Sequence, residues 1–127
     1  MTITVNNTLI YSQINSFIKQ VDDIFNLQNL DSEIVRLNKN KKLQYPSPYL
    51  IEVIKKSQIL SELTNGNFDI TVQPLWNYYY SHFILNRKSN FPDDKALKDI
   101  KKSINWQNVV IENNTIILKN NASITLN

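Results

Sequence analysis

Apolar side chains recur at intervals of three and four positions in the first part of the chain, a spacing typical of one face of an amphipathic helix. The pattern predicts a helix from about Thr8 to Asn26, with Thr8 as its N-cap. The apolar face consists of Ile10, Ile14, Phe17, Ile18, Val21, Ile24 and Phe25. We expect this face to pack against the core of the domain. A short strand is predicted before the helix, at Thr2 to Val5.

Start signals indicate two further helices. Asp31 is suited to be the N-cap of a short helix over residues 32–37. Ser47 followed by Pro48 predicts a longer helix that ends near Leu63, because proline is favoured at the first helical position. The side chains expected to point inward are Ile34 and Leu37 in the short helix and Leu50, Ile51, Ile54, Leu60 and Leu63 in the long one.

Helical and extended patterns alternate in the second half of the chain. An aromatic-rich helix is predicted over residues 75–85, with its aromatic side chains forming core and rim, and another helix begins near Asp93. Runs of β-branched residues at 106–111 and 115–119 predict a hairpin, and residues 123–126 predict one more strand. The fold class is therefore α+β, with helices packed on a largely antiparallel sheet.

The only glycine in the chain, Gly66, marks a sharp turn after the long helix. Residues 68–72 are apolar or β-branched around Asp69 and predict a short extended segment that stops at Pro74. Backbone at a glycine turn can approach a ligand closely, and the Asp69 carboxylate could accept hydrogen bonds from that ligand. The alternative is an ordinary helix C-cap followed by an ordinary strand.

Composition limits the function classes. A chain of 127 residues with 42% hydrophobic and 20% charged residues is sufficient for one domain, residues 1–127. The net charge of +3 is spread along the chain, and we expect no nucleic-acid binding, which requires a dense basic face. The absence of cysteine excludes thiolate chemistry, and His82 as the lone histidine excludes a multi-histidine metal site.

The sequence gives no sign of membrane insertion or export. No apolar run approaches the roughly 20 residues that span a bilayer. The first residues, M-T-I-T-V-N-N, lack the basic and apolar regions of a signal peptide, and there is no lipobox cysteine. As written, the chain is expected to be cytoplasmic.

Three stretches resemble motifs of the ApbE family, the FAD:protein FMN transferases. T-N-G-N-F-D-I-T-V-Q-P-L-W, at Thr64 to Trp76, is similar to the family's T-G-G-A-F-D-P-T-V-Q-P-L-W. Leu30 to Asn38 resembles D-S-x-(I/L)-x-x-L-N, and Ala122 to Asn127 resembles the strand before T-L-N-G-I-A-Q-G-Y. The three occur in the family's order along nearly the whole chain. The resemblance implies the N-terminal part of an ApbE-like fold, a single incomplete domain.

The resemblance also implies a function and a site. Family members transfer FMN from FAD to a Thr or Ser hydroxyl of a target flavoprotein, with Mg²⁺ assisting and AMP released. Asn67, Phe68 and Asp69 fall at family positions that contact FAD, as does Thr125 where many members have an aspartate. Gln28 replaces an aromatic that often contacts the flavin. No catalytic or metal residue is assigned, since the metal ligands are expected beyond Asn127.

Two functions follow from these implications. The first is FMN transfer, with this chain a truncated form of the enzyme whose activity alone is doubtful. The alternative is a non-catalytic remnant or a module that binds FAD or a protein without turnover.

Overall fold

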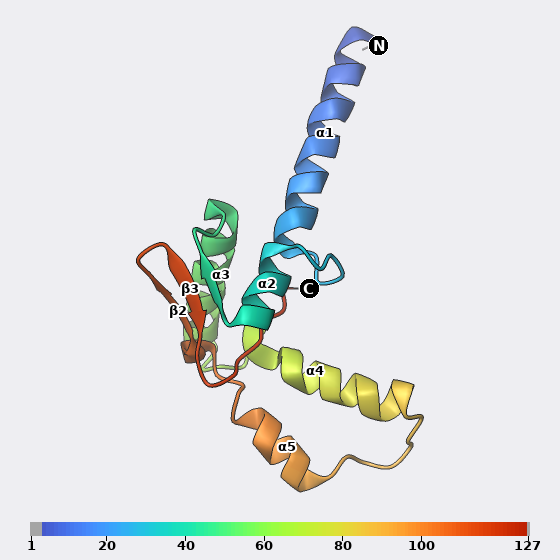
Figure 1. The fold of residues 1–127 in the computed structure, drawn as a ribbon, viewed down its shortest axis with the longest axis vertical. Helices are drawn as coiled ribbons and strands as arrows, with labels where there is room; N and C mark the ends of the chain where they lie inside the picture. The colour runs from blue at the N-terminus through green and yellow to red at the C-terminus, as the bar shows by residue number, and fades with distance from the viewer. Residues whose placement is uncertain (1–3, 127) are drawn as a thin grey trace.

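The computed structural model describes residues 4–126, with side chains described from residue 8 onward, and consists of helices around a small sheet (Figure 1). The main helices are α1 (Thr4–Phe25), α2 (Glu33–Asn40), α3 (Pro48–Leu63), α4 (Gln73–Tyr80) and α5 (Asp94–Lys101). Short helical turns are η1 (Ile70–Val72), η2 (Ser81–Leu85) and η3 (Trp106–Asn108). The strands are β1 (Lys42–Gln44), β2 (Val109–Glu112) and β3 (Thr115–Leu118).

The sheet of the described residues is antiparallel, with β3 between β1 and β2, so the predicted α+β class is confirmed. Ile116 at its centre pairs with Leu43 on one side and Ile111 on the other, and Ile116 is fully buried. The predicted hairpin is formed by β2 and β3. Its turn residues, Asn113 and Asn114, both have positive φ, which a type I′ hairpin turn requires and which asparagine tolerates.

The core lies between α2, α3 and the sheet. The apolar side chains with no exposed surface are Ile34, Leu37, Leu50, Ile54, Ile116, Ala122 and Ile124. The predicted inward positions of α2 are thus confirmed. Its N-cap is Ser32 rather than Asp31, because the Ser32 hydroxyl accepts a hydrogen bond from the Val35 amide at 3.3 Å while Asp31 is exposed.

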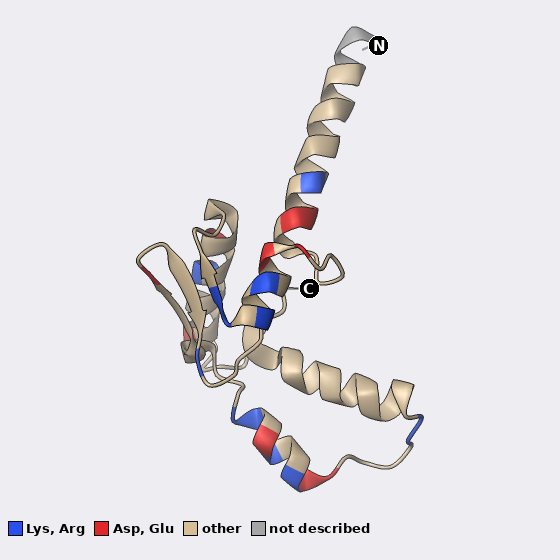
Figure 2. Ribbon diagram, viewed as in Figure 1, with Lys and Arg blue, Asp and Glu red and all other residues tan. Residues whose placement is uncertain are grey.

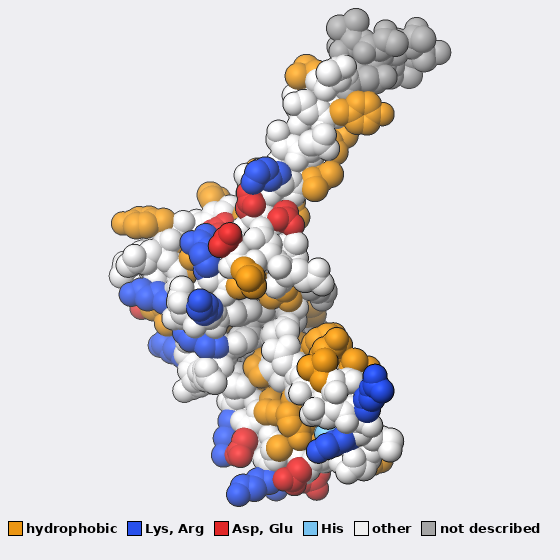
Figure 3. Space-filling view, turned by 45° about the vertical axis from the view of Figure 1, so that its right-hand side comes forward, with side chains coloured by type: hydrophobic (Ala, Val, Ile, Leu, Met, Phe, Trp, Pro, Cys, Tyr) orange, Lys and Arg blue, Asp and Glu red, His pale blue; other side chains and the backbone are white. Residues whose placement is uncertain are grey.

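Helix α1 differs from the prediction in its surroundings. The predicted helix is present, but it projects away from the other elements, and its apolar side chains lie along the projection (Figures 1 and 3). Phe17 is 58% exposed, and within residues 8–25 of this helix Ile24, near its end, is the one buried residue. The strand predicted at residues 2–5 is wrong for Thr4 and Val5, which belong to α1; Thr2 and Ile3 lie outside the described residues. Periodicity identifies an apolar face and does not say what covers it.

Helix α3 has the predicted bounds and the predicted N-cap, Ser47, but only part of the predicted buried face. Leu50 and Ile54 are buried, whereas Leu60 and Leu63 are 47% and 75% exposed. The face toward the core continues instead through two serines, Ser57 and Ser61. Their hydroxyls donate to helix carbonyl oxygens at 2.6 and 2.9 Å, so they can be buried without an unsatisfied polar group.

The aromatic helix is confirmed as α4, continued by the π-helical turn η2 to Leu85, but its rings are not in the core. Trp76 is 59% exposed and stacks on Tyr80 with ring centroids 5.1 Å apart. His82 is buried, and its Nε2 lies 2.7 Å from the Asn90 carbonyl oxygen. Helix α5 begins after the N-cap Asp93, as predicted.

Two predicted extended segments have no strand. Residues 70–72 form the 3₁₀ turn η1, and residues 122–126 run beside α2 without a ladder. Basic residues are distributed over α1, α2, α3, α5 and the connecting segments (Figure 2). No helix among residues 4–126 is long and apolar enough to cross a membrane.

Candidate functional site

The end of α3 directs the chain into the site. Gly66 has φ of +81°, and its amide donates to the Ser61 carbonyl oxygen at 2.8 Å, which closes the helix end. The Thr64 hydroxyl accepts a hydrogen bond from the Phe68 amide at 3.0 Å. These two bonds fix the direction in which Phe68 and Asp69 leave the helix.

Asp69 joins two parts of the chain through its carboxylate. One oxygen accepts from the Thr71 amide at 2.8 Å and the Thr71 hydroxyl at 2.6 Å, which makes Asp69 the N-cap of η1. The other accepts from the Trp106 amide at 3.1 Å, at the start of η3. Because both oxygens have partners within the chain, the structure gives Asp69 a structural role at this position.

The last described residues return to the same place. The Thr125 amide donates to the Ile70 carbonyl oxygen at 2.9 Å, so Thr125 lies next to the segment that follows Asp69. Ala122 and Ile124 are fully buried, while Ser123 and Thr125 are half-buried, which is the alternation of an extended segment.

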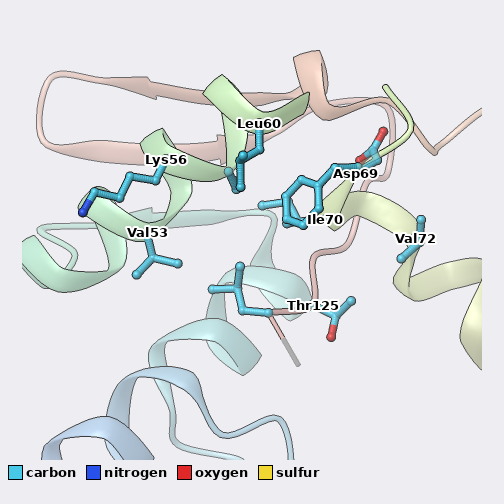
Figure 4. A pocket seen from close by; sticks show the side chains of 10 residues that line it. Val53, Lys56, Leu60, Asp69, Ile70, Val72 and Thr125 are labelled. Atoms are coloured by element: carbon cyan, nitrogen blue, oxygen red, sulfur yellow. The ribbon is translucent and has the colours of Figure 1, made fainter. Parts of the chain in front are cut away.

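A cavity of about 370 Å³ lies between these segments (Figure 4). Its walls come from α3, from the segment after it and from the last described residues. The lining residues are Val53, Lys56, Ser57, Leu60, Phe68, Asp69, Ile70, Val72, Thr125 and Leu126. Its volume lies near the lower end of the ~300–1,000 Å³ typical of small-molecule sites, and such sites are mostly apolar with a few polar groups.

The structure brings together three of the five residues at which the resemblance implies FAD contacts. Phe68, Asp69 and Thr125 line the cavity. Among the described residues, neither Gln28 nor Asn67 lines it. Gln28 is exposed in the loop between α1 and α2, where its backbone amide donates to the Asn26 side-chain oxygen at 2.9 Å, and Asn67 is exposed beyond the Gly66 turn.

Sequence reasoning missed the wall that α3 provides. Val53 and Leu60 are apolar, partly exposed and seven positions apart, on a face separate from the core face of the same helix. Lys56 lies between them, and its ammonium forms an exposed ion pair with Glu52 at 3.0 Å. The available signal was an excess of apolar positions on α3, more than one face of a helix can bury.

The described residues contain no assembled metal-binding group. Magnesium takes hard oxygen ligands, usually one or two carboxylates together with water and substrate phosphates. Among residues 4–126, no group of three His, Cys, Asp or Glu side chains comes close enough together to hold a metal ion. Asp69, the carboxylate in the cavity wall, is already bonded to Thr71 and Trp106. We therefore derive no step through a metal.

Comparisons with known proteins agree with the fold. The sequence model of the ApbE family matches residues 1–127. No functionally curated protein matches the chain. The structure of Pseudomonas stutzeri flavinyl transferase ApbE, in its apo form, is similar with a TM-score of 0.79 and 18% identity, over 93% of this chain and 38% of that one.

Two other solved structures are similar to the same extent. Flavin transferase ApbE from Vibrio cholerae has a TM-score of 0.75 and 23% identity, over 94% of this chain and 39% of its own. The ApbE protein from Thermotoga maritima has a TM-score of 0.77 and 22% identity, over 99% and 41%. The chain thus spans about two fifths of the length of these relatives. With the family match over its whole length, the chain belongs to the ApbE family.

Proposed function

We propose that this chain supplies part of the FAD site of an FAD:protein FMN transferase. The observation that supports the proposal is the cavity in which Phe68 and Asp69 meet Thr125, which is far from them in the sequence. Solved relatives of the same fold are named flavin transferases. In the proposed reaction, FMN moves from FAD to a Thr or Ser hydroxyl of a target flavoprotein.

The cavity wall has the chemistry to hold part of a flavin dinucleotide. Leu60, Phe68 and Ile70 offer an apolar surface on which a flat ring can pack, with an aromatic edge or face from Phe68. Lys56 is a cation at the same cavity, and its exposed pair with Glu52 is worth less than about 1 kcal/mol. Its ammonium can therefore turn toward a phosphate at little cost.

The transfer step requires groups in addition to these. The acceptor hydroxyl oxygen bonds to the phosphorus of the FMN moiety, the bond from that phosphorus to the bridging oxygen breaks, and AMP leaves with that oxygen. The hydroxyl proton passes to a base. The described residues bind and orient FAD in this proposal, and we assign no base or Mg²⁺ ligand to them. Positioning is itself a large contribution to phosphoryl transfer.

FAD titration of the full chain, followed by flavin fluorescence anisotropy, tests the binding role. Leu60→Asp places a carboxylate in the cavity wall, where we expect FAD affinity to fall about tenfold or more, about 1.4 kcal/mol. Ile59→Asp is the matched control, since Ile59 is adjacent on α3, 57% exposed and not among the lining residues. Equal affinities of the two variants, or no FAD binding by the wild-type chain, would contradict the proposal.

Binding without turnover is the second candidate. It is favoured by the Asp69 carboxylate, whose two oxygens are both bonded within the chain, and by the lack of a metal-binding group among residues 4–126. Incubation with FAD, Mg²⁺ and a target flavoprotein, followed by mass spectrometry of the target, separates the two. Covalent FMN on the target favours transfer, and FAD binding without covalent FMN favours a binding module.

A further inference from the structure

The segment at residues 122–126 is held by side chains of α2 instead of by a neighbouring strand. The Asn38 side-chain amide nitrogen donates to the Ile124 carbonyl oxygen at 2.9 Å, and its oxygen accepts from the Ile124 amide at 2.7 Å. Asn38 therefore satisfies both backbone groups of one residue, as the partner residue of an antiparallel ladder would.

A second side chain fixes the beginning of the segment. Lys41, which ends α2 with φ of +61°, donates from Nζ to the Ala122 carbonyl oxygen and to the Ser123 hydroxyl, both at 2.8 Å. On the far side, the Thr125 amide donates to the Ile70 carbonyl oxygen. The segment is thus connected to α2 on one side and to η1 on the other.

This arrangement determines where Thr125 lies. Successive side chains of an extended segment point to opposite faces. Ile124 is buried in the core, so Thr125 is directed away from the core, and it lines the cavity together with Leu126. Since Asn38 holds both backbone groups of Ile124, rotation or sliding of the segment would break its two hydrogen bonds and move Thr125 out of the cavity wall.

We propose that Asn38 is a positioning residue, which fixes Thr125 in the wall of the FAD cavity through its two hydrogen bonds to Ile124. The inference rests on the proposed function for the identity of the ligand. A carboxamide is required because it presents one donor and one acceptor in one plane. Molecules without the bonds would hold Thr125 correctly only part of the time, and the apparent Kd rises in inverse proportion to the fraction of molecules that hold it correctly.

The test uses Asn38→Asp in the full chain, with Asn40→Asp as the matched control. Asn40 is exposed on the same helix, so both variants add one negative charge near the end of α2. Near pH 7 the carboxylate introduced by Asn38→Asp faces the Ile124 carbonyl oxygen without a proton to donate. We expect FAD binding about tenfold weaker than in the control, the effect of losing about one net hydrogen bond.

The pH profile distinguishes positioning from a general loss of stability. A protonated acid at position 38 can donate to the Ile124 carbonyl oxygen, which favours the neutral form, whereas the Lys41 ammonium, bonded to Ala122 and Ser123 of the same segment, favours the carboxylate. The defect relative to Asn40→Asp should be full near pH 7 and should shrink as the pH falls through the pKa of this acid. A tenfold defect that narrows toward acidic pH supports the proposal, and equal affinities or a defect independent of pH would overturn it.

A second pair of variants separates failure of the inference from failure of the proposed function. Asn38→Leu removes both hydrogen bonds, and Asn40→Leu is its control. Amide hydrogen exchange at Ile124 and Thr125 should be at least tenfold faster in Asn38→Leu, with exchange in the middle of α3 unchanged. If the wild-type chain does not bind FAD, the proposed function fails, and the exchange result alone decides whether Asn38 positions the segment. Equal exchange rates in Asn38→Leu and Asn40→Leu would overturn the positioning role.

Discussion

Replacing Asp69 with alanine should destabilise the fold more than the loss of an ordinary helix cap. Asp69 caps η1 through Thr71 and also accepts the Trp106 amide hydrogen bond from a segment 37 positions away. The cap alone is worth about 1 kcal/mol. A hydrogen bond to a charged group adds about 1.5–3 kcal/mol. We therefore expect Asp69→Ala to lower the free energy of unfolding by about 2.5–4 kcal/mol.

Asp93→Ala is the matched control for this prediction. Asp93 is also an N-cap aspartate, whose side chain accepts from the Lys95 amide at 3.2 Å at an exposed site. Its loss should cost about 0.5–1 kcal/mol. The loss of unfolding free energy caused by Asp69→Asn should lie between the losses caused by these two substitutions. The asparagine oxygen can still accept from Thr71, while its amide nitrogen would meet the Trp106 N–H.

Urea unfolding followed by far-UV circular dichroism measures all three variants against the wild-type chain. The slope of the free energy with urea should be unchanged, since the same surface is exposed on unfolding. If Asp69→Ala costs no more than Asp93→Ala, the bond to Trp106 contributes little. A carboxylate that contributes little to folding would be available to a ligand, and the structural role of Asp69 would then be wrong.

Three other changes have measurable outcomes. Gly66→Ala should lower the free energy of unfolding by about 1 kcal/mol, because its φ of +81° is strained with a Cβ although no atom within 4 Å would meet it; an unchanged melting temperature would contradict this. Ile24→Ala should cost about 2–4 kcal/mol in urea unfolding, and Ile14→Ala less than about 1, because only Ile24 is buried; equal costs would mean that α1 packs along its length. Burial lowers the pKa of Lys41, so between this lowered pKa and 10.5 the unfolded chain binds more protons than the folded chain. The stability of the wild type relative to Lys41→Met should therefore rise with pH across that range; unfolding at several pH values up to about 10.5 that shows a constant difference would contradict it.

Local signals predicted the elements better than their surroundings. Ser47 and Pro48 gave the start of α3, and Gly66 gave its end, because caps depend on a few adjacent residues. The hairpin was likewise predicted from two β-rich runs around adjacent asparagines. Residues 122–126 also have a β-rich pattern, but their partners are the side chains of Asn38 and Lys41. A hydrogen bond across more than 80 positions has no local signal.

The family resemblance identified Phe68, Asp69 and Thr125 as a group, and the structure brings these three to one cavity. It did not reveal how they are brought there. The Asp69 bond to Trp106 and the Asn38 bonds to Ile124 depend on tertiary closure. Gln28 and Asn67 carry the same resemblance and lie outside the cavity lining, so motif position alone does not determine which residues line this cavity.

The incorrect assignment of Leu60 to the core contains information about function. A helix that covers one core needs a single apolar stripe, and Leu50, Ile54, Ser57 and Ser61 already form that stripe on α3. Val53 and Leu60 form a second one, and Val53 lines both the cavity shared with Phe68 and a smaller cavity against Phe17 and Val21 of α1. Serines in the core stripe and leucine outside it are the reverse of what stability alone would favour. Apolar residues kept on the outer face are therefore best explained by a ligand or another polypeptide surface that contacts them, which is the role that the proposed FAD site gives to Leu60.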